Sequence, residues 1–99
     1  MIEESRNPHE TREHRVKRLT MRSMRRGIKE MDLILMRFAA AKLAAMEEGG
    51  LDAYDALLSE NDQDLYQWVT GQIEPPARHE AIVGEIREAI AEGYAASDR

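Results

Sequence analysis

The chain has 99 residues, a formal net charge of -5 at pH 7 and no cysteine. This length leaves room for one domain with a modest core, and it excludes a second domain or a long catalytic insert. The lack of cysteine excludes disulfides, thiolate metal sites and cysteine nucleophiles, and no apolar run approaches the roughly 20 residues that span a bilayer.

The composition predicts an all-α fold, a small single-domain bundle of about five helices. Good and fair helix formers fill most of the chain, and no run alternates between apolar and polar residues as a strand would. We expect residues 1–10 to be a flexible N-terminus, residues 11–93 to form the helical domain and residues 94–99 to be a frayed C-terminal tail.

The first predicted helix runs from about Thr11 to Arg26. Apolar and small side chains recur along one side of it at about 100° per residue, and arginines gather on the other side. These arginines are Arg15, Arg18, Arg22, Arg25 and Arg26. Gly27 suits the left-handed backbone position that ends a helix, so we expect the helix to end there.

The second predicted helix runs from about Ile28 to Met46, with apolar side chains at three- and four-residue spacing. Gly49 and Gly50 are expected to break it. Asp52 then offers an N-cap for a short third helix that buries two leucines near its end.

The fourth predicted helix is capped by Asn61 or Asp62 and closed by Gly71. A double proline then forces an extended connection before a final amphipathic helix, which ends near Gly93. The expected core is Met31, Ile34, Leu35, Phe38, Leu57, Leu58, Leu65, Trp68, Ile82, Ile86 and Ile90.

The residues that could carry catalysis or bind a metal do not form a site in the sequence. His9 and His14 are five residues apart, roughly 140° around a helix, so they cannot share a metal ion as the two histidines of a zinc-protease helix do. His79 has no identifiable partner. The sequence has no phosphate-binding glycine loop and no nucleophile elbow. We therefore predict no catalytic residue, no metal site and no enzyme activity.

The charges are distributed unevenly along the chain. Residues 1–30 hold nine Lys or Arg against five Asp or Glu, and the remainder is strongly acidic. The arginines of the first helix therefore have two interpretations of equal weight. They pair with the acidic remainder of the same chain, or they dock on an acidic partner. Nucleic acid is not the expected partner, because the arginine face lacks stacking aromatic residues.

Arg26-Gly27-x-x-Glu30 also has two interpretations. In the first, Gly27 ends one helix, Glu30 lies in the first turn of the next, where the helix dipole favours an acid, and Arg26 pairs with Glu30. In the second, the glycine bares backbone between two helices and lets another chain approach closely beside a fixed pair of opposite charges.

Three stretches of the sequence together resemble the SdhE family of FAD assembly factors, called succinate dehydrogenase assembly factor 2 in mitochondria. They are RSMRRGIKEMDLILMRFA, the short LDAYDALL segment, and DQDLYQWVTG with the double proline that follows. The resemblance covers about Arg18 to Ile90. The chain departs from the family at Met24, where many relatives carry an aromatic residue, and in a longer N-terminal extension.

The resemblance implies a five-helix domain that binds the flavoprotein subunit of succinate dehydrogenase or fumarate reductase. It further implies that the domain promotes the covalent histidyl linkage of that subunit to FAD, without catalysing a reaction itself. FAD is then the cofactor of the partner, and we expect none bound stably to this chain. On this resemblance Arg26, Gly27 and Glu30 lie on the partner-binding surface, and we add Arg22, Arg25 and Asp32 beside them.

We expect the free chain to be a cytoplasmic monomer that neither binds nucleic acid nor inserts into a membrane. The alternative function is a generic helical protein-interaction module, or an antitoxin-like regulator, that docks through its arginine-rich face. The two functions differ in the partner that each requires.

Overall fold

The fold is known from a computed structural model that describes residues 10–93. In chain order the elements are α1 (Arg12–Arg22), α2 (Lys29–Lys42), the 3-10 turn η1 (Leu43–Ala45), α3 (Glu48–Leu57), α4 (Asp62–Val69), the 3-10 turn η2 (Ala77–His79) and α5 (Glu80–Ala91). The described residues contain no strand, so the predicted all-α fold with five helices is confirmed. The predicted C-terminal tail, and all of the predicted N-terminal segment except Glu10, lie outside the described residues.

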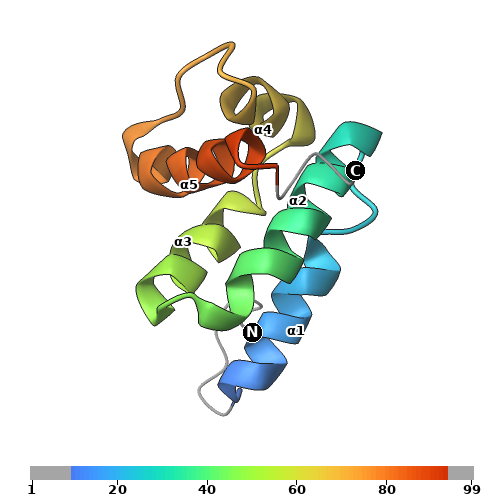
Figure 1. Cartoon of the computed structure of the whole chain (residues 1–99), viewed down its shortest axis with the longest axis vertical. Helices are drawn as coiled ribbons and strands as arrows, with labels where there is room; N and C mark the ends of the chain where they lie inside the picture. The colour runs from blue at the N-terminus through green and yellow to red at the C-terminus, as the bar shows by residue number, and fades with distance from the viewer. Residues whose placement is uncertain (1–9, 94–99) are drawn as a thin grey trace.

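Helix α2 is the centre of the arrangement. It contacts α1 on one side and α4 and α5 on another, while α3 packs against α5. Figure 1 shows α1 and α2 side by side, α3 beside them at one end, and α4 and α5 together at the other end. Because the chain passes from α1 into α2 at the end near α4, the loop between α1 and α2 comes close to the start of α4.

The predicted core is confirmed with one exception. Every residue expected in it is buried except Ile90, which is half-buried near the end of α5. The structure adds several residues that the sequence did not single out for the core. They are Leu19, Ala39, Leu43, Leu51, Tyr54, Val69, Val83 and Ala89. The rings of Phe38 and Tyr54 lie 5.5 Å apart between centroids, which joins α2 to α3.

The predicted end of the first helix is wrong by one turn. Helix α1 ends at Arg22 with Ser23 as its C-cap, and the left-handed position is taken by Arg25, with φ of 57°, rather than by Gly27. The Ser23 hydroxyl donates to the Leu19 carbonyl oxygen over 2.9 Å and lies 2.6 Å from the Tyr54 hydroxyl. The helix therefore ends where Ser23 makes a buried contact with α3, a contact between distant segments that the local sequence does not reveal.

The predicted break at Gly49 and Gly50 is also wrong, because both glycines lie inside the first turn of α3. The chain turns earlier, at Met46, whose backbone is extended with ψ of 145°. Asp52 is therefore inside α3 and is not its N-cap. A Cβ on Gly50 would lie 2.6 Å from Met46 Cγ, so this glycine allows the Met46 side chain to pack closely against the helix.

The ends of the fourth helix agree with the sequence. The Asn61 side chain accepts hydrogen bonds from the backbone N–H groups of Gln63 and Asp64, as an N-cap does. Gly71 follows the helix with φ of 82°, the left-handed conformation that favours glycine.

The buried hydroxyl of Tyr54 predicts a loss of stability at alkaline pH. Burial raises the pKa of Tyr54 to about 12, from 10.0. Because the pKa of Tyr54 is higher in the folded state than in the unfolded state, the neutral hydroxyl stabilises the fold. This contribution is fully present below pH 10 and is lost as the pH rises through 12. We expect the free energy of unfolding to fall by about 3 kcal/mol over that range. The Tyr54→Phe variant should lack this part of the fall when urea denaturation is measured at each pH, and equal falls would contradict the prediction.

Candidate partner-binding site

The predicted site residues lie in and around the loop between α1 and α2. Two carboxylates hold the backbone of this loop. The Arg26 N–H donates to Asp32 Oδ1 over 2.6 Å, and the Gly27 N–H donates to Asp62 Oδ2. Asp32 belongs to the first turn of α2 and Asp62 to the first turn of α4. The loop is therefore fixed at two consecutive N–H groups by two different helices.

Arg26 is bound by other segments of the same chain. Its Nε donates to Asp62 Oδ1 over 2.8 Å, and its two terminal nitrogens donate to the carbonyl oxygens of Arg22, Leu58 and Glu60 at 3.2 to 3.3 Å. The predicted pair between Arg26 and Glu30 is wrong, because Asp62, 36 residues away in the chain, takes the guanidinium instead. Arg26 therefore ties the loop to the connection between α3 and α4.

Gly27 is exposed, and because it has no side chain, the Asp62 carboxylate can approach its backbone closely. A Cβ at this position would lie 3.0 Å from Asp62 Oδ2, the atom that accepts the Gly27 N–H. Such a contact is tighter than a methyl group and a carboxylate oxygen ordinarily make. A side chain at this position would therefore press on the Asp62 carboxylate, whereas the sequence had suggested that the glycine serves a left-handed backbone.

Glu30 is the charged residue of the motif that faces outward. It is exposed in the first turn of α2, and its carboxylate makes no hydrogen bond or ion pair with any residue from 10 to 93. The N-terminus of a helix favours a negative charge at this position. A fixed loop therefore stands beside an unpaired carboxylate, which is available to accept a hydrogen bond or an ion pair from another molecule.

Arg25 also faces outward. Its side chain is exposed and has no polar partner within the described part of the chain, and its backbone is held at φ of 57°, a conformation that costs a non-glycine residue roughly 1 kcal/mol. We expect Arg25→Gly to unfold at an equal or higher temperature than the wild-type chain. If the side chain contacts a partner, the same variant should bind that partner more weakly, whereas wild-type binding would remove Arg25 from the site.

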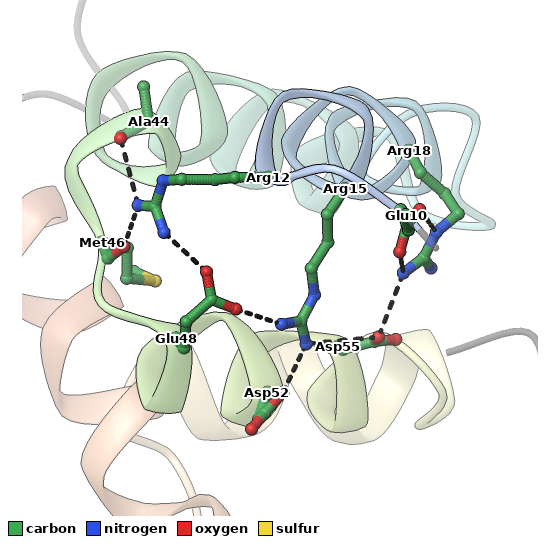
Figure 2. A network of polar contacts seen from close by, with 9 residues as sticks. All are labelled: Glu10, Arg12, Arg15, Arg18, Ala44, Met46, Glu48, Asp52 and Asp55. Carbon is green, nitrogen blue, oxygen red and sulfur yellow. Dashed lines mark hydrogen bonds and ion pairs between the residues drawn. The ribbon is translucent and has the colours of Figure 1, made fainter. Parts of the chain in front are cut away.

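Other arginines of the first helix contact α3, and Figure 2 shows Arg15 and Arg18 among them. Arg15 is 6% exposed, and its guanidinium binds Glu48 at 2.8 Å and also Asp52. Arg22 donates to Asp55, which is 3% exposed and also has Arg18 at 3.6 Å. Pairing within the chain, one of the two interpretations from the sequence, is therefore confirmed for these arginines.

Two further members of this network were not predicted. Arg12 binds Glu48 at 2.8 Å and donates to the carbonyl oxygens of Ala44 and Met46, which fixes the turn before α3 (Figure 2). Glu10, assigned from sequence to the N-terminal segment, accepts from Arg18 Nε over 2.7 Å, and this hydrogen bond lowers the pKa of Glu10. Acidic residues at three- and four-residue spacing on α3 are the pattern from which this network could have been predicted.

His79 has a partner that sequence analysis could not identify. Its Nε2 lies 2.8 Å from Glu60 Oε2, and its buried ring lies 5.6 Å from that of Trp68. The hydrogen bond with His79, followed by that of Arg78, lowers the pKa of Glu60. Within residues 10–93 no three His, Asp or Glu side chains gather as metal ligands, and no helix is both long and apolar enough to cross a membrane. His9 lies outside these residues.

Comparison with known proteins places this fold and loop in a family. Residues 17–90 match the model of the family Sdh5, described as flavinator of succinate dehydrogenase. Succinate dehydrogenase assembly factor 2, mitochondrial, of Meyerozyma guilliermondii is 46% identical over 69 residues, which are 70% of this chain and 51% of that protein. The protein of the same name from Candida glabrata is 55% identical over 53 residues, which are 54% of this chain and 35% of that protein.

A bacterial relative matches over more of its own length. The FAD assembly factor SdhE of Legionella pneumophila (strain Lens) is 43% identical over 63 residues, which are 64% of this chain and 80% of that protein. The chain thus spans about half of one yeast relative, about a third of the other and most of the bacterial one. Since the family model covers three quarters of the chain, including α2, α3, α4 and the loop with Arg26, Gly27 and Glu30, the chain belongs to the Sdh5 family, whose description is flavinator of succinate dehydrogenase.

Proposed function

We propose that the chain is an assembly factor that binds the flavoprotein subunit of succinate dehydrogenase and promotes its covalent attachment to FAD. Family membership supports this function, and so do the names of the relatives. The structural observation that carries it is the unpaired carboxylate of Glu30 beside a loop that Asp32 and Asp62 hold in place. Fumarate reductase, whose flavoprotein subunit also carries FAD, is the second candidate partner.

In this proposal the chain acts by binding and not by catalysis. The bond-forming histidine belongs to the flavoprotein, and FAD is the cofactor of that partner. A helper that binds the competent arrangement of flavoprotein and flavin more tightly than other arrangements raises the population of the competent one. Such a shift requires differential affinity but no reactive group on the helper, which agrees with a site built from a carboxylate, a glycine and a held loop.

The contacts give less support to the alternative function, a helical interaction module that docks through its arginine face. Arg15, Arg18, Arg22 and Arg26 all bind acidic groups of the same chain. Docking on an acidic partner would require these pairs to break and would leave buried carboxylates such as Asp55 without their partners. Only Arg25 of the predicted arginine face remains unpaired within the described residues.

Deletion of the gene tests the proposed function. We expect the flavoprotein subunit of the deletion strain to lose its covalent flavin, measured as fluorescence of the denatured subunit in a gel. The wild-type gene on a plasmid should restore it. Full fluorescence in the deletion strain would reject the proposal. Running the flavoprotein subunit of fumarate reductase in the same gel decides whether it is a second partner.

We propose three further properties that are consistent with the same function. The purified chain should elute as a monomer, and it should retain no FAD when mixed with the free cofactor and passed over a desalting column. We place it in the cytoplasm, where a bacterial flavoprotein subunit folds, although the yeast relatives carry the word mitochondrial in their names. Fractionation of the source cells followed by immunoblotting checks the compartment.

A further inference from the structure

A hollow of about 420 Å³ lies directly beside Glu30, between α2, α4 and the end of α5. Its walls are mostly aliphatic, formed by Leu33, Ile34, Val69 and Ile90, with Tyr66 and Thr70 on the α4 side. Pockets of about 300 to 1,000 Å³ hold small ligands, so this hollow has room for a large apolar side chain. Leu33 is 41% exposed at its edge, and Ile90, which was expected in the core, is half-buried here.

A second hollow of about 200 Å³ adjoins the first at Tyr66, which lines both. Its walls differ in chemistry from those of the first. Ile28 is the aliphatic member, and the side-chain amides of Gln63, Gln67 and Gln72 supply hydrogen-bond donors and acceptors. We call these two hollows, which share Tyr66 as a wall, the groove; one of them is aliphatic and the other is rich in amides.

Among residues 10–93, Glu30 is the only charged residue that lines the groove. Its carboxylate has no polar partner within residues 10–93. An occupant that matches these walls has one large apolar side chain, a cation or N–H donor close to it, and an exposed backbone for the amides. An extended peptide segment with a basic residue next to an apolar one has this chemistry.

We propose that the groove receives an extended segment of the flavoprotein subunit, an inference that rests on the function proposed above. An apolar side chain of the segment fills the hollow bounded by Leu33 and Val69, and a neighbouring cationic or N–H group binds Glu30. The groove shares Glu30 with the candidate site, so it extends that site along α4. Loss of contact at the apolar end weakens binding even when the carboxylate and the loop are intact.

The experiment measures the affinity of the full chain for the purified flavoprotein subunit of succinate dehydrogenase by isothermal titration calorimetry. Leu33→Gln should weaken binding by about tenfold or more, because it removes an apolar contact that the complex buries. Met36→Gln is the matched control. Met36 is 37% exposed on the same helix and lines neither hollow, so its variant should bind within about twofold of the wild type.

A second variant fills the hollow instead of shortening its wall, and it also removes the hydrogen bonds that the Thr70 hydroxyl makes with the Tyr66 carbonyl oxygen and the Gln72 side chain, at 2.6 and 3.0 Å. Thr70 is exposed on the rim, and Thr70→Trp should place a large ring in the hollow and weaken binding by a similar factor. Thermal melting of each variant confirms that it is folded. If Leu33→Gln and Thr70→Trp bind as the wild type does while Glu30→Ala binds weakly, the groove is not used and the proposed function stands. If the wild-type chain does not bind the flavoprotein at all, both proposals fail.

Two other occupants have distinct outcomes in the same experiment. A second copy of this chain in the groove would appear as concentration-dependent association of the free chain that Thr70→Trp abolishes. Residues 94–99 in the groove would appear as tighter binding of the flavoprotein when they are removed. Either outcome would overturn the assignment of the groove to the flavoprotein.

Discussion

Replacement of Asp55 by alanine is expected to destabilise the domain by about 3 to 5 kcal/mol, a large share of the stability of a small domain. Asp55 is 3% exposed, and it accepts from Arg22 while Arg18 and Arg15 lie 3.6 and 4.0 Å from its other oxygen. Its removal leaves several guanidinium groups facing an empty, partly buried space. Loss of one partner of a buried ion pair is costly because the remaining charge is no longer compensated.

Asp52→Ala is the matched control for this prediction. Asp52 lies one turn earlier on α3 and binds the same Arg15, but its side chain is 48% exposed. Water replaces the lost carboxylate there, so we expect a change below about 1 kcal/mol. The free energies of unfolding come from urea denaturation of the two variants and the wild type. Equal effects of the two substitutions would show that burial of Asp55 does not govern the strength of this network.

The second large effect separates the two charged residues of the Arg26-Gly27-x-x-Glu30 motif. Glu30→Ala should cost the isolated domain only about 0.3 to 1 kcal/mol, since Glu30 contributes a favourable charge at the start of α2 and makes no pair within residues 10–93. Its effect on function should be much larger. A donor of the flavoprotein that loses the Glu30 carboxylate in a desolvated complex weakens binding by about 2 to 5 kcal/mol, tens to thousands of times in affinity.

Arg26→Ala should reduce the stability of the isolated domain more than Glu30→Ala does. Arg26 binds Asp62 at 2.8 Å with both side chains mostly buried, and its loss should cost roughly 1.5 to 3 kcal/mol of stability. Thermal melting of each variant is paired with covalent flavin on the flavoprotein in cells that carry only that variant. A stable Glu30→Ala protein that supports full flavin attachment would contradict the assignment of Glu30 to the partner surface. An Arg26→Ala protein as stable as the wild type would contradict the structural assignment of Arg26.

Sequence periodicity determined the helices and most of the core. Met31, Ile34, Leu35 and Phe38 recur at the spacing of one helix face, and all of them are buried. This worked because burial of an apolar stripe depends on spacing along one helix and is the main source of stability for such a helix. The family resemblance, carried by three short stretches, was likewise present in the sequence and is confirmed by the family match.

Tertiary structure alone decided which partners the residues of the loop between α1 and α2 bind. Spacing along the chain suggested Arg26 with Glu30, whereas Arg26 binds Asp62, a residue 36 positions away that the fold brings to the loop. A Cβ at Gly27 would press on the same aspartate, and Gly49 and Gly50 lie inside a helix because the chain turns at Met46. Long charged side chains reach any partner within several ångströms in space, so contacts between distant segments select their partners. Local sequence therefore predicts which face of a helix is buried, but the fold determines which charges remain free to bind another protein.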